Sequence, residues 1–353
     1  MVLPGSYLSL LLLLIFSMIC WGSWANMQKL AGGRWRFELF CFDFSLGVAL
    51  CAVVAAFTLG SLDSKELTFE DNFLITGYRN MAYAVGAGMV FNLGNMLLIG
   101  AISVSGMALA FPVGLGLALV TGVAINYAVN PQGDPLMLFS GVALVVVSII
   151  LASAAYTANI EARRMAAAKA AAADPGAPPR RRLPRAARGI ALSTICGVII
   201  GLFYPLLIHQ AWAEPAISPY GTAVLFAAGV LISTFLYNPF FMNFPIQGRP
   251  VELKAYFMGG KREHLLGVLA GAIWMGGGIA SFVAINSSAI GQVGPSLSYA
   301  VGQGGVVIGT LWGIFGWREF HGSGTRAKLL LIGMFLFFGA GLAVVALAPL
   351  YGR

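Results

Sequence analysis

The sequence predicts an all-α membrane protein whose roughly ten transmembrane helices form two inverted five-helix repeats. Of its 353 residues, 59% are hydrophobic and only 10% are charged, against roughly 25% charged residues in an average soluble domain. Apolar stretches of about 20 residues recur along the chain, and only helices or closed barrels satisfy backbone hydrogen bonds in hydrocarbon. These stretches are too long and too apolar for barrel strands, so we expect helices.

Hydropathy and turn residues together divide the chain into five spans, a linker and five more spans. The first repeat covers 1–157, the linker 158–187 and the second repeat 188–353. The linker is rich in Ala, Pro and Arg, a composition that cannot build a packed core. The expected spans are 7–27, 39–60, 80–102, 106–128, 135–157, 188–209, 221–245, 263–286, 292–316 and 327–349.

The distribution of basic residues predicts the orientation. If the linker is cytoplasmic, 18 of the 21 Lys and Arg residues lie on that side, and only Lys65, Arg79 and Arg353 lie outside. We therefore expect a multi-pass protein of a bacterial-type inner membrane with both termini outside. The same bias explains the net charge of +8, so no nucleic-acid partner is expected. The expected partners are a small-molecule substrate and the lipid bilayer, and a homodimer is left open.

Two five-span halves cross the membrane an odd number of times each, so the second half is inverted relative to the first. A shift of 185 residues places Ser103 on Ser288 and Gly106 on Gly291. Both halves thus have a very short turn before the fourth helix. In such folds the substrate sits near the midplane, between the repeats.

Four polar side chains lie deep within expected spans, where polar groups are costly unless they bind or pair. Asn92 and Asn95 are one turn apart on one helix face, and Tyr299 and Gln303 are similarly spaced on the ninth span. Their amides and hydroxyl are candidates for binding a polar substrate. Hydrogen bonds between helices are the alternative role.

Aromatic residues away from the membrane interface form a second group of candidates. Trp21, Trp24 and Trp274 lie beside small residues, where an indole ring can stack on a sugar or a planar ligand, and a packing role is the alternative. Tyr204 precedes Pro205, whose missing N–H frees a carbonyl for a ligand, a water or a neighbouring helix.

Asp43 is the carboxylate that the expected spans place clearly within the membrane. Desolvation there favours its neutral form and pairing with Arg36 or Lys29 favours its charged form, so it is a candidate for proton coupling. A structural ion pair is the alternative. The four cysteines lack metal-ligand spacing, and no histidine looks like a metal ligand. We expect no cofactor and no metal, with a proton or sodium ion as the coupling ion.

Two functional classes are disfavoured by what the sequence lacks. No GxxxxGK[ST] segment occurs, which argues against ATP-driven transport. No Ser/His/Asp grouping and no HExxH segment suggests an enzyme.

Three segments carry a resemblance to a known family. They are CWGSWANMQKLAGGRWRFELFCFDFSLGVAL, GAGMVFNLGNMLLIGAISVSGMALAFPVGLGLALVTGVAINY and GIFGWREFHGSGTRAK. They resemble the drug/metabolite transporter superfamily, within it the branch of ureide permeases, the rhamnose–proton symporter and glucose/ribose uptake proteins, and most of all the ureide permeases. Trp21, Asp43, Gly94 and Asn95 lie within the matched segments. Plant ureide permeases have a long central loop with a nucleotide-binding-like motif, which the short basic linker lacks.

This resemblance implies a ten-helix inverted-repeat transporter driven by a proton or sodium gradient. The expected function is proton-coupled symport, by alternating access, of a small neutral polar metabolite such as a ureide or a nucleobase. A monosaccharide symporter of the glucose, ribose or rhamnose type is the main alternative. A multidrug exporter is less well supported, because its membrane-embedded acid would be Asp43, which lies off centre.

Overall fold

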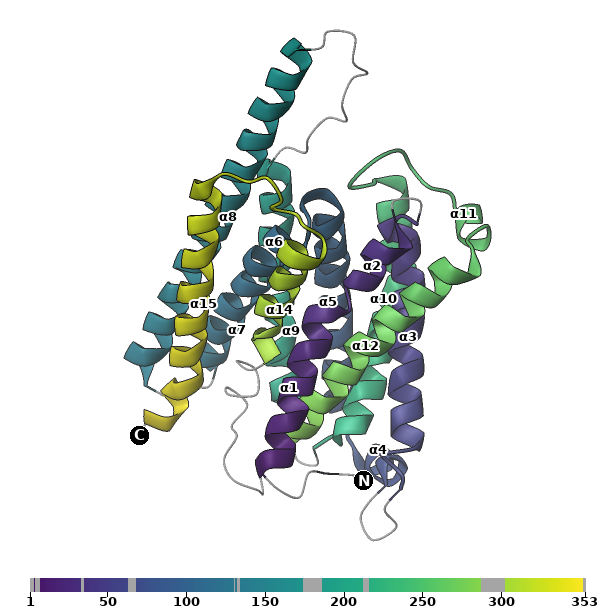
Figure 1. Ribbon diagram of the computed structural model, residues 1–353. Coiled ribbons are helices and arrows are strands. Elements are labelled where there is room, and N and C mark those ends of the chain that lie inside the picture. The colour runs from purple at the N-terminus through teal and green to yellow at the C-terminus, as the bar shows by residue number, and fades with distance from the viewer. Residues whose placement is uncertain are drawn as a thin grey trace.

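The computed structural model is a bundle of helices (Figure 1) and describes residues 3, 7–32, 35–62, 68–129, 131, 134–173, 186–211, 216–286 and 302–351. Within these residues, nine helices are long and apolar enough to cross a membrane. The segment Gly305–Gly316 adds a shorter apolar helix. This helix is the end of the expected ninth span, whose residues 292–301 lie outside the described part.

The first half of the chain supplies five of the nine membrane-spanning candidates. Helices α1 and α2 together make the first, and a short α6 and a π-helical turn η1 precede α7 in the fourth. The elements are α1 (Tyr7–Ser23), α2 (Asn26–Ala31), α3 (Phe37–Phe57), α4 (Phe69–Ile75), α5 (Tyr78–Ser105), α6 (Met107–Ala110), η1 (Phe111–Leu115), α7 (Gly116–Val129) and α8 (Pro135–Ala173).

The second half supplies the other four candidates and the shorter apolar helix. Its elements are α9 (Ala186–Ala211), α10 (Pro219–Asn243), α11 (Lys254–Phe257), α12 (Lys261–Asn286), α14 (Gly305–Leu311), η2 (Trp312–Gly316) and α15 (Thr325–Tyr351). The spans expected from hydropathy agree with these bounds to within a few residues, apart from the end of α8 and the ninth span.

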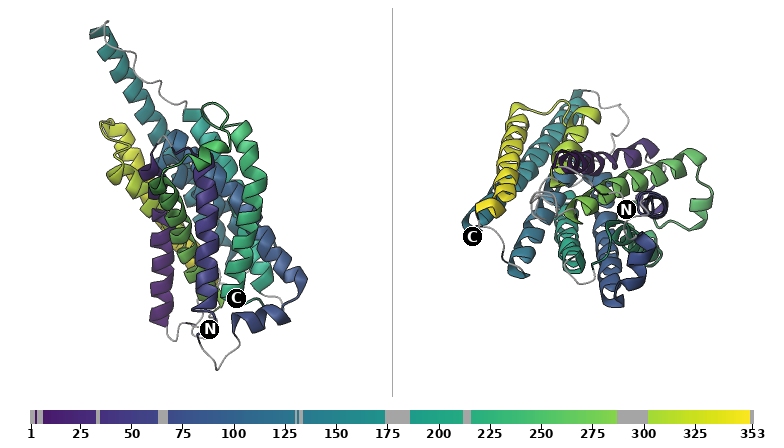
Figure 2. Two further views of the ribbon diagram at one scale, coloured as in Figure 1. Left: turned by 90° about the vertical axis from the view of Figure 1, so that its right-hand side faces the viewer. Right: turned by 90° about the horizontal axis from the view of Figure 1, so that it is seen from below.

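Helix α8 continues 16 residues past the end of the fifth expected span, and it projects beyond the rest of the bundle (Figure 2). Its last part reads ARRMAAAKAAAA, and Ala, Arg and Lys are among the strongest helix formers. The helix therefore takes up the first half of the predicted linker. The prolines of the linker lie in 174–185, outside the described residues, and the division at 158–187 stays a prediction.

Glycines bring the two halves of the chain into close contact. Helix α3 packs against α12, where a Cβ added at Gly47 or Gly271 would lie 2.0 Å from a carbonyl oxygen of the other helix. Helix α5 packs against α10 in the same way, with 2.1 Å at both Gly88 and Gly229. Only a residue without a side chain allows backbones to approach this closely.

The two ends of the bundle differ in charge. The beginning of α1 and the end of α15 lie at one end, and α2, the extension of α8 and α11 lie at the other (Figure 1). The second end carries Lys29, Arg36, Arg163 and Arg249, and we call it the basic end. The chain thus separates its basic segments from its termini, as the distribution of Lys and Arg predicts.

Candidate functional site

An aromatic cluster occupies the interior between α1, α3, α5, α10 and α12. The Trp274 ring of α12 lies 4.2 Å from Phe91 and stacks on Phe226 at 5.6 Å, measured between ring centroids. Trp21 stacks on the same indole at 5.9 Å and donates its Nε1–H to the Trp274 carbonyl at 3.1 Å. Trp24 is buried and lies against Phe44 of α3 at 5.1 Å. The three tryptophans named from the sequence are therefore brought together.

One face of α5 runs from the aromatic cluster past Asn95 to the contact with Gln28 of α2. Phe91, Asn95 and Ile99 follow one another at intervals of four residues, so they lie in one row along the helix. Phe91 contacts Trp274, and the Ile99 carbonyl accepts a hydrogen bond from Gln28 Nε2 at 3.2 Å. Asn95 is thus held between the aromatic cluster and Gln28.

The amide of Asn95 is buried without a partner. Its side chain is 1% exposed, and neither Nδ2 nor Oδ1 makes a hydrogen bond to any described residue. The Oε1 atom of Gln28, which is 7% exposed, is equally unpaired within that part of the chain. Buried polar groups are nearly always hydrogen-bonded, because leaving one unsatisfied costs about 1–3 kcal/mol. A polar ligand here could therefore accept from the two N–H groups of Asn95 and donate to the side-chain oxygens of Asn95 and Gln28.

Asn92, one turn away, has a different environment. Its Nδ2 lies within 3.1 Å of the Val230 carbonyl, the Ser233 hydroxyl and the Thr234 hydroxyl, all on α10. Its amide N–H groups are therefore used in joining α5 to α10, the alternative role that the sequence left open.

The remaining substrate candidates are placed only in part. Gln303 is 7% exposed and lies between Gly302 and Gly304 just before α14. A Cβ added at Gly302 would lie 2.7 Å from the Trp21 ring, so this segment packs directly on the aromatic cluster. Tyr204 lies within α9, although its side chain is outside the described part, and Tyr299 is outside it entirely.

Asp43 is 1% exposed and belongs to a polar cluster near the basic end. Its Oδ1 accepts a hydrogen bond from the Tyr256 hydroxyl at 2.6 Å and lies 2.9 Å from His264 Nδ1. Burial and the hydrogen bond to Asp43 raise the pKa of Tyr256 well above its usual value, so this hydroxyl stays a donor at neutral pH. The Trp35 ring packs edge-on against His264 at 4.7 Å.

The expected partners of Asp43 bind other carboxylates. Arg36 pairs with Glu38, a fully buried acid in the first turn of α3, and Lys29 pairs with Glu319. Helix α3 begins two residues before the expected start, which brings Glu38 into the spanning segment. His264 lies near the start of α12. Its side chain is 29% exposed, and its ring reaches inward to Asp43.

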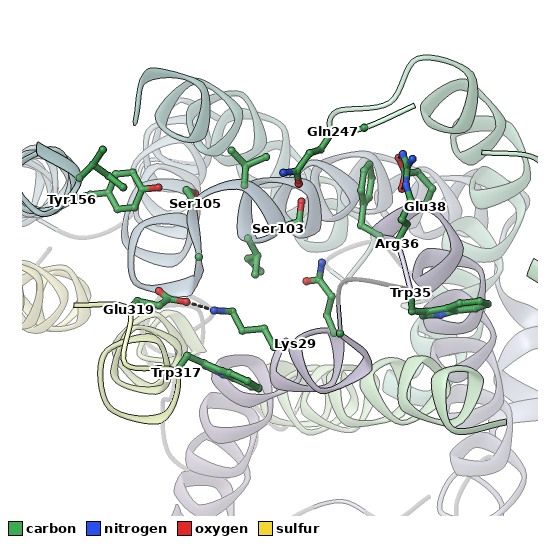
Figure 3. A pocket seen from close by; sticks show the side chains of 18 of the residues that line it. Lys29, Trp35, Arg36, Glu38, Ser103, Ser105, Tyr156, Gln247, Trp317 and Glu319 are labelled. Atoms are coloured by element: carbon green, nitrogen blue, oxygen red, sulfur yellow. Dashed lines mark hydrogen bonds and ion pairs between the residues drawn. The ribbon is translucent and has the colours of Figure 1, made fainter. Parts of the chain in front are cut away.

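A cavity of about 800 Å³ lies at the basic end (Figure 3). It is lined by Gln28, Lys29, the last turn of α5, Arg163 of α8 and Glu319, and we call it the vestibule. Gln28 is shared between the vestibule and the row that contains Asn95, one turn deeper along α5. The unpaired amide of Asn95 therefore lies directly behind the inner wall of the vestibule.

Glu319 is the most connected residue of the vestibule. Its carboxylate pairs with Lys29 (Figure 3) and accepts hydrogen bonds from the backbone N–H groups of Met107 at 2.9 Å and Ala108 at 2.7 Å, at the start of α6. Its carbonyl accepts from Asn159 at 3.1 Å and from Arg163 at 2.7 Å. One residue of the second half thus holds three elements of the first half.

Sequence reasoning missed Gln28, Glu38, Tyr256, His264 and Glu319. All five lie at or beyond the ends of expected spans, where polar residues are ordinary and carry no signal of their own. Gln28, Glu38 and Glu319 do fall inside segments that carry the family resemblance, which was an available clue. Among the described residues, no group of three His, Cys, Asp or Glu side chains is arranged to hold a metal ion.

Known proteins match the chain along most of its length. A family model described as ureide permease matches residues 40–176. Ureide permease 4 of Arabidopsis thaliana is 24% identical over 395 residues, covering 94% of this chain and 95% of that protein. Ureide permease 1 of the same plant is 23% identical over 392 residues, covering 97% and 96%.

A solved structure described only as the crystal structure of a protein superposes with a TM-score of 0.50 at 15% identity. The superposition covers 97% of this chain and 98% of the chain in the solved structure. At this identity the likeness concerns the fold alone.

The apolar helices, the buried polar groups and these matches define a class: a multi-pass membrane transporter, not an enzyme. Within that class, the chain is ureide permease-like over nearly its whole length. The resemblance to the ureide permeases that was read from the sequence is confirmed.

Proposed function

We propose that this protein is a proton-coupled symporter for a small neutral polar metabolite with planar amide groups, such as a ureide or a nucleobase. The observation that carries the proposal is the unpaired amide of Asn95, buried next to the aromatic cluster around Trp274. A planar ligand with N–H and C=O groups on its edge would satisfy Asn95 and Gln28 while its faces stack on the indole of Trp21 or Trp274. The names of the plant relatives point to the same class of substrate.

The substrate is tested by uptake into liposomes that contain the purified protein, with labelled allantoin, uracil and a panel of monosaccharides. We expect saturable uptake of a ureide or nucleobase, and a fall of roughly fivefold to 150-fold for Asn95→Ala, since two lost hydrogen bonds are worth roughly 1–3 kcal/mol. Asn243→Ala is the matched control, because Asn243 is exposed and, among the described residues, its side chain bonds to Pro239 of its own helix. Saturable uptake of monosaccharides alone would select the sugar symporter instead.

Asp43 is proposed to carry the coupling proton. It is buried, it is held by one neutral donor, Tyr256, and one titratable ring, His264, and the His264 side chain is partly exposed at the basic end. This chain of groups offers a proton a route from the surface to a buried carboxyl.

Asp43→Asn separates proton coupling from substrate binding. Exchange of labelled for unlabelled substrate requires no net proton movement, so the variant is expected to keep exchange and to lose accumulation driven by a proton gradient. Retention of proton-driven accumulation would make Asp43 a structural residue. An equal response of the wild type to a sodium gradient would reassign the coupling ion.

Alternating access between two inverted five-helix repeats is proposed as the mechanism. Its support is that corresponding helices of the two halves make corresponding contacts: α3 crosses α12 through Gly47 and Gly271, and α5 crosses α10 through Gly88 and Gly229. Matching contacts of this kind are expected of repeats related by a pseudo-two-fold axis.

Access to the vestibule provides the test of this mechanism, with the basic end proposed to be cytoplasmic. Ser103 is an exposed lining residue, and Glu252 lies in the exposed loop before α11. In a chain whose own cysteines have been replaced, Ser103→Cys should react with a membrane-impermeant maleimide from the cytoplasmic side at a rate that changes with substrate, while Glu252→Cys should react at a constant rate. Unchanged reaction at both sites would argue against alternating access.

A further inference from the structure

A second cavity, of about 570 Å³, lies between η2 and α15 at the basic end. Leu311 and Phe315 form one wall, and Leu331, Ile332 and Phe335 form the other. The Phe315 side chain is 72% exposed and Ile332 is 56% exposed, so the groove is open along the outside of the bundle. In a protein that spans a membrane, a groove with such walls is filled by hydrocarbon, and we call it the lipid-facing groove.

The polar end of this groove is basic. Arg318, His321 and Lys328 line it, and no carboxylate does so within the described part of the chain. The salt bridges found among the described residues do not involve Arg318 or Lys328. Lys328 lies in the first turn of α15, where the helix dipole already favours an anion and a lysine adds to the positive potential. The charge at this end is therefore complementary to a bound anion.

Ser323 gives an independent sign of a missing polar ligand. It lines the same groove, its side chain is 7% exposed, and its Oγ is buried with no hydrogen-bond partner among the described residues. An unsatisfied buried hydroxyl is costly unless something accepts or donates a hydrogen bond. The hydroxyl and the two cations face one space.

The backbone at Arg318 explains how one short segment serves two sites. Arg318 has a φ of 50°, which is uncommon for any residue other than glycine. Arg318 lines the groove, whereas the next residue, Glu319, lines the vestibule and pairs with Lys29. Unusual backbone conformations persist where surrounding contacts hold them, and they concentrate at binding sites.

We propose that the lipid-facing groove binds one anionic phospholipid, with its acyl chain along the apolar walls and its phosphate at Arg318, Lys328 and Ser323. A basic pocket at the membrane surface attracts anionic headgroups, and the apolar walls select a lipid over a free phosphate ion. The site is separate from the one proposed for the transported substrate.

The full-length protein is delipidated and then mixed with phosphatidylglycerol or phosphatidylcholine. The lipid molecules bound to it are counted by native mass spectrometry. We expect one tightly bound phosphatidylglycerol. The charge-removing variant Arg318→Gln/Lys328→Gln should lower its affinity by about thirtyfold, equivalent to about 2 kcal/mol. The control Lys261→Gln/Arg262→Gln removes two exposed cations from the first turn of α12, outside the groove, and should retain the lipid.

Two milder variants keep the test decisive if the double variant folds poorly. Ser323→Ala should weaken phosphatidylglycerol binding, and Ile332→Trp, which fills the groove and keeps its charge, should weaken binding of both lipids. Equal binding of the two lipids by wild type, equal loss in the α12 control, or full displacement of the lipid by inorganic phosphate would each overturn the proposal. These outcomes do not depend on transport, so failure of this site and failure of the proposed function are distinguishable.

Discussion

Two asparagines one turn apart on α5 provide the sharpest test of the structure. Asn92 donates to three acceptors on α10, while Asn95 has no partner among the described residues. Replacing each by alanine removes the same atoms from the same helix at almost the same depth. The two variants should nevertheless differ in stability.

The expected magnitudes follow from these contacts. Hydrogen bonds between membrane helices are worth about 0.6 kcal/mol on average and up to about 1.7 kcal/mol, so Asn92→Ala should lower the free energy of unfolding by about 1–2 kcal/mol. Asn95→Ala removes a buried amide whose unsatisfied burial costs about 1–3 kcal/mol. Part of that relief is offset by lost packing, so this variant should be neutral or about 1 kcal/mol more stable.

The assay is equilibrium unfolding in mixed micelles, followed by tryptophan fluorescence with and without the transported substrate. Substrate should stabilise wild type and Asn92→Ala, and it should fail to stabilise Asn95→Ala, which can no longer bind it tightly. The reasoning is refuted if Asn95→Ala is destabilised as much as Asn92→Ala, because its amide would then be bonded within the protein.

Three further predictions concern packing and charge. Gly88→Ala should abolish folding or activity, since its Cβ would meet an α10 carbonyl at 2.1 Å, whereas Gly86→Ala, with nothing within 4 Å, should match wild type in expression and uptake. Glu319→Ala should lower the free energy of unfolding roughly twice as much as Lys29→Ala does, because it also leaves two backbone N–H groups without an acceptor. An equal loss of stability in the two variants would contradict this. Because the pKa of Tyr256 is raised in the folded protein, its hydrogen bond contributes its full stability below about pH 10, and this contribution is lost as the pH rises further. The difference in unfolding free energy between wild type and Tyr256→Phe should therefore narrow only above that pH.

The candidate site residues that could be predicted were those that stand out against an apolar background. An amide, an indole or a carboxylate within a hydrophobic span is conspicuous, and Trp21, Trp274, Asn95 and Asp43 were named as candidates on that ground. What each one does could not be predicted, because a hydrogen bond joins residues far apart in the chain. Asn92 and Asn95 look alike until α10 is placed beside one of them.

Residues at helix ends were invisible to the same reasoning. His264 is separated from Asp43 by 221 positions, and Glu319 from Lys29 by 290. Each is a common polar residue near a loop. Its partner comes within reach only through tertiary packing, of α12 on α3 for His264 and of the segment after η2 on α2 for Glu319.

The sequence by itself determined the environment, the number and approximate bounds of most helices, and the separation of charge between the two ends. These follow from composition and hydropathy, which are local properties of about 20 residues at a time. The tertiary structure alone decided which polar groups are satisfied, which remain unpaired and which cavities they line. Those outcomes depend on helix crossings, such as the one at Gly47 and Gly271, that bring distant residues within hydrogen-bonding distance.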